Sequence, residues 1–140
     1  MSVPAVLSPL FVEVALTFLL LFWSGRERVG AVQRGEVKTR DIALRQPNWP
    51  ERATQLGNAY QSQLELPVLF YLLTILTLIT SRQTIFFVIL AWAFVIARLG
   101  HALVHGTTNN VPRRFFLFLA GALILLVMWV MFILQIFLGL

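Results

Sequence analysis

Two sets of three polar residues have the types and the spacing of a ligand-binding site. Each set falls at positions i, i+3 and i+7, a spacing that places three side chains on one face of a helix. Their amide, carboxylate, guanidinium and imidazole groups can together bind an anion that also carries an amino group. The first set is Asn58, Gln61 and Glu65, and the second is Arg98, His101 and His105.

The composition places these polar residues in a membrane protein. Of the 140 residues, 59% are hydrophobic and 12% are charged, and the mean hydropathy is +0.82. Because a soluble domain carries about 25% charged residues, this balance excludes a disordered chain and argues against a water-soluble enzyme. In such a chain the net charge of +5 is better explained by basic residues that set the orientation in the membrane than by nucleic-acid binding. The sequence contains no cysteine, so any thiol chemistry must use a thiol that arrives with a ligand.

Charges and turn residues divide the sequence into four apolar stretches, each long enough to cross a bilayer as a helix. We predict an all-α fold: an integral membrane four-helix bundle of left-handed, up-down topology, in one domain over residues 1–140. Pro67 predicts a kink in the second helix. Asn109 or Asn110 can cap the fourth helix, with Pro112 in its first turn. The predicted helices span about residues 3–25, 51–80, 84–105 and 111–140.

The predicted loop at about residues 26–50 carries most of the positive charge. Seven of the eleven basic residues lie between Arg26 and Arg52. Such a loop is either functional or a solvated connector that fixes orientation. With four spans, the membrane side that holds this loop carries ten of the eleven basic residues, the loop's own included. The positive-inside rule therefore predicts a cytoplasmic loop and both termini outside. Because no basic residue precedes the first apolar run, we expect that run to be a retained helix and not a signal peptide.

Up-down topology brings the polar faces of the second and third helices to one membrane depth, near Arg113 and Arg114 at the start of the fourth. One interpretation is a structural ion pair between Glu65 and Arg98. The other is a ligand pocket that opens to the cytoplasm and has apolar walls suited to a lipid-soluble partner. More polar groups converge here than an ion pair needs, which favours the pocket.

Two further polar features of the sequence have other possible interpretations. His101 and His105 have the spacing of zinc-binding helices, but a third ligand is lacking and Ala102 stands where such helices carry Glu, so we predict no metal site. Glu13 is the only charge in the first helix, where it pairs across a subunit interface, carries protons or sits near the outer surface. We expect it on the opposite membrane side from the pocket and leave it out of the site.

Two sequence blocks resemble a known family. One is Asn-Ala-Tyr-Gln-Ser-Gln-Leu-Glu-Leu-Pro-Val-Leu-Phe-Tyr at Asn58–Tyr71, and the other is Ala-Arg-Leu-Gly-His-Ala-Leu-Val-His at Ala97–His105, followed by Asn109-Asn110 and Arg113-Arg114-Phe115. The sequence resembles a bacterial member of the MAPEG family, the membrane-associated proteins in eicosanoid and glutathione metabolism. The resemblance implies a homotrimer of four-helix subunits in the inner (cytoplasmic) membrane, with glutathione bound between neighbouring subunits near the cytoplasmic face.

The same resemblance implies roles for residues of the second helix. Glu65 matches the glutathione-contacting Glu of an Arg-Asn-x-x-Glu pattern, with Gln61 and Ser62 where Arg and Asn usually stand. Matching Asn58 to the family's Asn instead would put Gln61 at the position of the Glu, and we prefer Glu65 because a proline and the apolar run follow it. Lys38 resembles a basic loop position that touches glutathione.

Residues of the third and fourth helices also receive roles by resemblance. Arg98 and His101 match an Arg-x-x-His pattern, and His105 replaces a Tyr common in mammalian members. Arg114 resembles the arginine proposed to activate the glutathione thiol, which makes it our candidate catalytic residue. We place its neighbour Arg113 among the glutathione-binding residues.

The resemblance implies a glutathione S-transferase or peroxidase, with glutathione as co-substrate and a lipophilic electrophile or hydroperoxide delivered from the bilayer. A non-catalytic binding or scaffold protein on the same trimeric fold is the alternative. A small transporter subunit that uses Glu13, Glu65 and the histidines as a proton path is less favoured, because the sequence shows no discontinuous or repeat-related helices. The predicted partners are two further copies of the chain, glutathione, a lipophilic small molecule and membrane lipid, but not nucleic acid.

Overall fold

The computed structural model describes residues 2–139, which form α-helices and one short 3-10 helix without a strand. The all-α prediction is therefore confirmed for these residues. Four apolar segments are long enough to cross a membrane, and the second of them consists of two helices, α2 and α3. The elements are α1 (Val3–Gln33), η1 (Thr39–Asp41), α2 (Glu51–Ser62), α3 (Leu66–Ile79), α4 (Ile85–Gly106) and α5 (Val111–Leu138).

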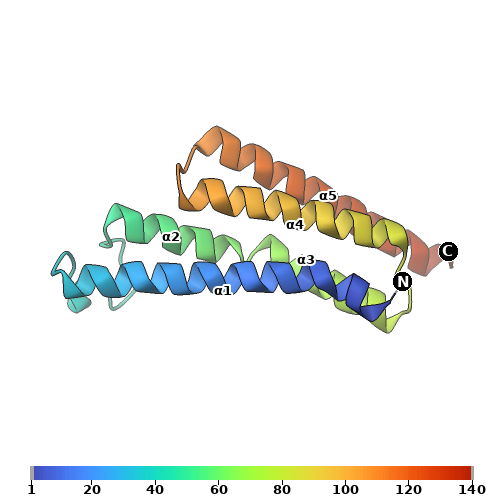
Figure 1. Cartoon of the computed structure of the whole chain (residues 1–140), viewed down its shortest axis with the longest axis horizontal. Helices are drawn as coiled ribbons and strands as arrows, with labels where there is room; N and C mark the ends of the chain where they lie inside the picture. The colour runs from blue at the N-terminus through green and yellow to red at the C-terminus, as the bar shows by residue number, and fades with distance from the viewer. Residues whose placement is uncertain (1, 140) are drawn as a thin grey trace.

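The spans run alternately up and down the bundle (Figure 1). Both ends of the chain lie at one end of the bundle, with the turn at residues 80–84, and we call this the terminal end. The connector at residues 34–50 and the turn at residues 107–110 lie at the other, the loop end. Helix α4 packs against α5, α1 and α2, so it occupies the centre of the fold. The predicted up-down topology is confirmed, whereas the left-handed sense of the bundle stays a prediction.

Helix α1 continues two turns beyond the predicted end at residue 25, so the predicted loop at 26–50 is wrong at its start. Arg26, Glu27 and Arg28 are compatible with a helix that leaves the lipid and continues into water. The helix ends at Gln33, with Arg34 as its C-cap. Gly35 follows with a φ of +75°, the left-handed conformation that glycine adopts without steric strain. The connector therefore spans residues 34–50.

The second span is broken at residues 63–65, where the sequence predicted only a kink. Pro67 lies in the first turn of α3. A proline inside a continuous helix would lack its N–H group, and its ring would clash with the carbonyl of Gln63 four residues earlier. The chain avoids this clash with a tight turn, in which the amides of Gln63 and Leu64 donate to the carbonyls of Tyr60 and Gln61.

The remaining helix ends agree with the sequence to within a residue or two. Thr84 caps α4 by accepting a hydrogen bond from the amide of Phe87. Of the two candidate caps of α5, Asn110 accepts from the amide of Arg113, while Asn109 adopts a positive φ of 52° in the turn before it. Helix α5 ends at Leu138, and the predicted end at Leu140 lies outside the described residues.

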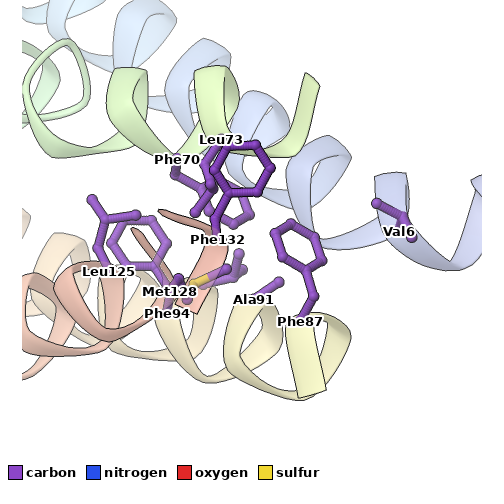
Figure 2. Close-up of a cluster of buried hydrophobic side chains, with 10 residues drawn as sticks. Val6, Phe70, Leu73, Phe87, Ala91, Phe94, Leu125, Met128 and Phe132 are labelled. Carbon is purple, nitrogen blue, oxygen red and sulfur yellow. The ribbon is translucent and has the colours of Figure 1, made fainter. Parts of the chain in front are cut away.

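The largest apolar core lies toward the terminal end (Figure 2). The rings of Phe70 and Phe94 are 4.9 Å apart at its centre, which joins α3 to α4. Nearer the loop end the helices approach through small residues, because Ala59 of α2 and Ala102 of α4 share a second cluster with Leu20 of α1.

Candidate functional site

A cavity of about 420 Å³ lies toward the loop end, between α2, the last turns of α4 and the first turns of α5. Polar side chains from α2 and α4 form two of its walls, and α5 contributes one cation and three apolar side chains. The cavity is lined by Asn58, Gln61, Ser62, Glu65, His101, His105, Val111, Arg114, Phe115 and Phe118.

The α5 wall is one face of a helix. Val111, Arg114, Phe115 and Phe118 fall at i, i+3, i+4 and i+7, so their side chains project in one direction. Arg113 projects about 100° away from Arg114, and it is exposed and does not line the cavity. The guanidinium of Arg114 donates a hydrogen bond of 2.7 Å to the side chain of Asn109, which holds the cation at the cavity.

The α4 wall carries two buried imidazoles. His101 is 4% exposed and His105 8%, and the rings meet edge to face with centroids 5.4 Å apart. Within the described residues, Nδ1 of each ring has no hydrogen-bond partner. The end of α4 is fixed from α2, since Arg52 donates to the carbonyl of Gly106 and Gln55 to that of His105. The histidines thus offer unused ring nitrogens on a well-anchored helix end.

The α2 wall is mostly exposed in the single chain. Asn58, Gln61 and Glu65 are all exposed, whereas Ser62 is buried. Their common face follows from the i, i+3, i+7 spacing, although the break places Glu65 just beyond the end of α2. Side chains that are polar and exposed on an otherwise apolar span would be costly against lipid.

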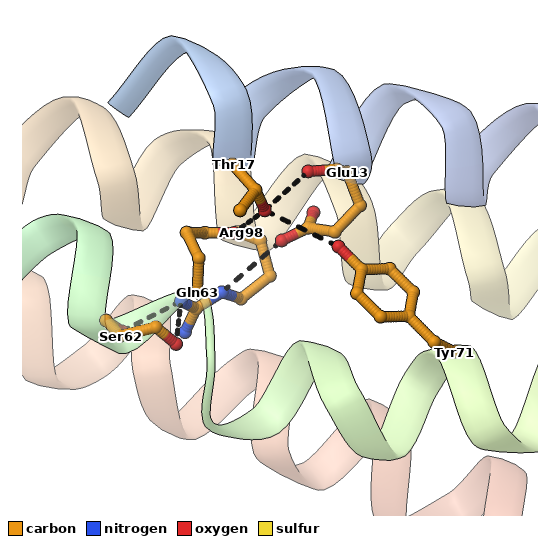
Figure 3. Close-up of polar contacts among 6 residues, drawn as sticks. All are labelled: Glu13, Thr17, Ser62, Gln63, Tyr71 and Arg98. Carbon is orange, nitrogen blue, oxygen red and sulfur yellow. Dashed lines mark hydrogen bonds and ion pairs between the residues drawn. The ribbon is translucent and has the colours of Figure 1, made fainter. Parts of the chain in front are cut away.

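Behind the cavity, Arg98 forms a buried ion pair with Glu13 of α1 (Figure 3). Both side chains are fully buried, and Arg98 Nε lies 4.0 Å from Glu13 Oε1. Arg98 Nη2 also donates to Ser62, to the carbonyl at 3.1 Å and to the hydroxyl at 2.8 Å. The prediction that Glu13 lies on the opposite membrane side from the pocket residues is therefore wrong. Among the described residues, the carboxylate within ion-pair distance of Arg98 is that of Glu13. The alternative of a Glu65–Arg98 ion pair is therefore not what the structure shows.

Three neutral residues complete this network. The amide of Gln63 is best oriented with its nitrogen toward Glu13 and its oxygen toward Arg98 Nη2, because that orientation satisfies both groups. Thr17 donates to the backbone carbonyl of Glu13 at 3.0 Å, and its hydroxyl lies 3.5 Å from that of Tyr71. The network therefore connects α1, the α2–α3 break, α3 and α4.

The structure brings together seven of the ten residues predicted for the site. Arg98 lies behind the cavity, bound to Glu13 and Ser62, and does not line it. Arg113 faces away, and Lys38 is exposed in the connector just before η1. The seven that line the cavity are Asn58, Gln61, Ser62, Glu65, His101, His105 and Arg114.

The sequence reasoning missed the apolar wall and the second layer of polar contacts. Val111, Phe115 and Phe118 share the helical spacing of Arg114, so the choice of Arg114 already pointed to that face. Gln63 carried no comparable signal, since its position in the break depends on how the chain avoids the proline clash.

The cavity residues lie within a segment that matches a known family. The sequence profile of the MAPEG family matches residues 6–134, which include residues from all four spans and every side chain that lines the cavity. Separate comparisons with functionally curated proteins and with solved structures each gave no match.

Proposed function

Because this chain belongs to the MAPEG family, the membrane-associated proteins in eicosanoid and glutathione metabolism, we propose that it binds glutathione in the cavity at the loop end. We further propose that it is a glutathione S-transferase or peroxidase for lipophilic electrophiles or hydroperoxides. One observation carries the proposal: the cavity combines a carboxylate, a guanidinium and two imidazoles with unpartnered nitrogens beside an apolar wall.

These groups match the functional groups of glutathione, which has one amino group, two carboxylates and a thiol. The carboxylate of Glu65 accepts from the amino group, and it is the one acid lining the cavity. Side-chain amides of Asn58 and Gln61 and N–H groups of the imidazoles donate to the carboxylates. A volume of about 420 Å³ lies in the range of small-ligand sites.

Arg114 supplies the chemistry of thiol activation. A free thiol has a pKa of about 8.5, so only a few per cent is thiolate at neutral pH. A fixed cation beside the sulfur favours the thiolate, and the thiol proton passes to water. The sulfur then forms a bond to an electrophilic carbon of the lipophilic substrate, and either the bond to a leaving group breaks and that group departs with its electron pair, or a carbon–carbon double bond opens and takes up a proton from water. With a hydroperoxide, two glutathione molecules instead reduce the peroxide to an alcohol and water and leave as the disulfide.

The apolar wall supplies the contact for the second substrate. Val111, Phe115 and Phe118 line the cavity on the α5 side, and Val111 and Phe115 are also exposed on the outside of the bundle. A lipophilic molecule in the bilayer would therefore meet apolar side chains continuous with the cavity. This arrangement favours delivery of the substrate from the membrane.

We propose that the active form is a homotrimer. The single chain leaves three polar residues of the cavity exposed, namely Asn58, Gln61 and Glu65. Contact of these side chains with lipid would be unfavourable. A neighbouring copy over this face would remove them from lipid and close the cavity around the ligand. We place the trimer in a bacterial inner membrane, with the loop end in the cytoplasm.

Calorimetric titration of the purified protein in detergent with glutathione tests the proposal. We expect binding that Glu65→Gln weakens at least about tenfold, since a hydrogen bond to a charged group contributes roughly 1.5–3 kcal/mol. The matched control is Glu51→Gln, which alters an exposed acid of α2 outside the cavity and should leave the affinity within about a factor of two. A wild-type protein that does not bind glutathione would overturn the proposal.

A non-catalytic binding or scaffold role is the second candidate. It is favoured by Gln61, Ser62 and His105, which replace the Arg, Asn and Tyr of the family patterns. Such a protein would bind glutathione without ionising its thiol. Turnover with a lipophilic electrophile, measured on protein shown to bind glutathione, separates the two roles.

A further inference from the structure

The break between α2 and α3 needs support from outside its own backbone. The carbonyl of Ser62 lies at the end of α2, and among the described residues the one backbone amide that donates to it is that of Glu65, at 3.3 Å. Arg98 donates to that carbonyl and to the Ser62 hydroxyl through one nitrogen. A cation at the carboxyl end of a helix is also favoured by the helix dipole. Arg98 therefore holds the end of α2.

This support acts on the cavity wall from behind. Ser62 and Glu65 stand at the two ends of the break, and both line the cavity. Arg98 does not line it, and its guanidinium binds the Ser62 side of the break. The positions of Ser62 and Glu65 in the cavity wall consequently depend on Arg98, which does not itself line the cavity.

Arg98 in turn depends on α1. A fully buried guanidinium is strongly unfavourable unless a charge and hydrogen bonds compensate it. Among the described residues, Glu13 is the carboxylate within ion-pair distance, and Gln63 bridges the two groups from within the break. Figure 3 shows Glu13, Ser62 and Gln63 converging on Arg98 from α1, the end of α2 and the break, respectively.

We propose that Glu13 is a positioning residue for the cavity. Its carboxylate orients Arg98, Arg98 fixes Ser62 and the α2–α3 break, and the break sets where Glu65 meets the ligand. The identity of that ligand, glutathione, rests on the proposed function, whereas the mechanical link from Glu13 to the break does not. Glu13 itself does not line the cavity and is not proposed to touch the ligand.

The test separates positioning from simple stabilisation with a pair of variants. Glu13→Gln leaves Arg98 buried without a counter-charge, so we expect lower thermal stability and at least about tenfold weaker glutathione binding. The double variant Glu13→Gln, Arg98→Met removes both charges and should recover the thermal stability and the oligomeric state. It should not recover the affinity, because Ser62 still lacks its donor. Recovery of stability and affinity together would overturn the proposal.

The matched control is Glu36→Gln. Glu36 also pairs with an arginine, Arg34 at 3.1 Å, but both side chains are about half exposed and lie in the connector. This variant should change neither stability nor affinity measurably, because exposed ion pairs contribute little. An effect as large as that of Glu13→Gln would mean that charge alone, and not burial at the break, controls the site.

Amide hydrogen exchange tests the same link without any ligand. In the double variant we expect faster exchange at residues 63–66 than in wild type, with α5 unchanged, because the break has lost its side-chain support. Unchanged exchange at the break would overturn the positioning role even if glutathione binds. Faster exchange at the break combined with a wild type that does not bind glutathione would contradict the proposed function alone.

Discussion

The two ends of the bundle share helices but differ in what fills the space between them. The terminal end holds a cluster of apolar side chains that includes Phe70, Leu73 and Phe94 (Figure 2). The loop end holds a cavity, two imidazoles with unpartnered nitrogens, and the buried pair of Glu13 and Arg98 behind them. Helix α4 runs through both ends, so one helix carries an apolar interior in its first half and a polar one in its second.

This difference separates stability from ligand binding. In a bilayer the outside of the bundle is as apolar as its core, so close packing and polar contacts hold the helices together. The terminal end supplies close packing. At the loop end, ring nitrogens without partners lower stability, and a bound ligand can offset that loss by pairing with them. Changes at the terminal end should therefore alter stability, and changes at the cavity should alter binding.

The largest contrast is which side of the membrane each end faces. Ten of the eleven basic residues lie toward the loop end: seven between Arg26 and Arg52, together with Arg98, Arg113 and Arg114. We predict from the positive-inside rule that reporter fusions at either terminus report the outside, and fusions in the connector the cytoplasm. A cytoplasmic C-terminus would reverse the assignment of the cavity to the cytoplasmic side.

Leu73→Ala should lower stability more than substitutions of residues that line the cavity. Leu73 is fully buried in the apolar cluster, and truncating such a side chain in a protein core costs roughly 3 kcal/mol. Unfolding in detergent measures the loss. Glutathione affinity per folded protein should stay within about a factor of two, as expected for distant sites that add independently. A loss of affinity like that of Glu65→Gln would show that the two ends are coupled.

Arg114→Ala should have a smaller effect, confined to the bound thiol. We expect affinity to change only a few-fold, while the pKa of bound glutathione rises by about one unit, which corresponds to roughly 1.4 kcal/mol. Arg113→Ala is the matched control, because its side chain is exposed and points away from the cavity. Absorbance of the thiolate against pH measures both. If Arg113 proves the sensitive position, the assignment of the activating residue is wrong.

His105→Leu should produce the smallest effect. We expect it to raise the stability of the protein and to lower its affinity for glutathione. The unpartnered Nδ1 is removed from a buried position, so we expect stability to rise by about 1 kcal/mol. Glutathione affinity should fall, since a donor at the cavity is lost. A fall in both quantities would mean that the imidazole serves packing and not the ligand.

The four spans could be predicted because they depend on hydropathy, charge and capping residues alone. The grouping of polar residues on α2 and α4 followed from helical spacing. Arg114 was chosen by resemblance, and Arg113, which was predicted beside it in the site, does not line the cavity. The extension of α1 to Gln33 could not be read from hydropathy, because a helix can continue past the lipid when its residues permit it. The break at residues 63–65 needed knowledge of how the chain avoids the clash at Pro67.

The pairing of Glu13 with Arg98 was missed although a signal for it existed. Helices α1 and α4 both begin at the terminal end (Figure 1). At 1.5 Å per residue, Glu13 lies about 15 Å along α1 and Arg98 about 20 Å along α4, a difference that an arginine side chain can span. Counting depth from the end that two helices share is therefore a better guide to buried pairs than assigning each charge to the nearest membrane surface.

Binding of glutathione at the loop end and ionisation of its thiol are the two parts of the proposed function. The most direct measurement is the thiolate absorbance of glutathione bound to the wild-type protein in detergent, followed across pH at saturating glutathione. We predict that thiolate is present near neutral pH, well below the ordinary thiol pKa of about 8.5. A bound thiol that titrates like free glutathione would contradict the second part and leave a binding protein without catalytic activation.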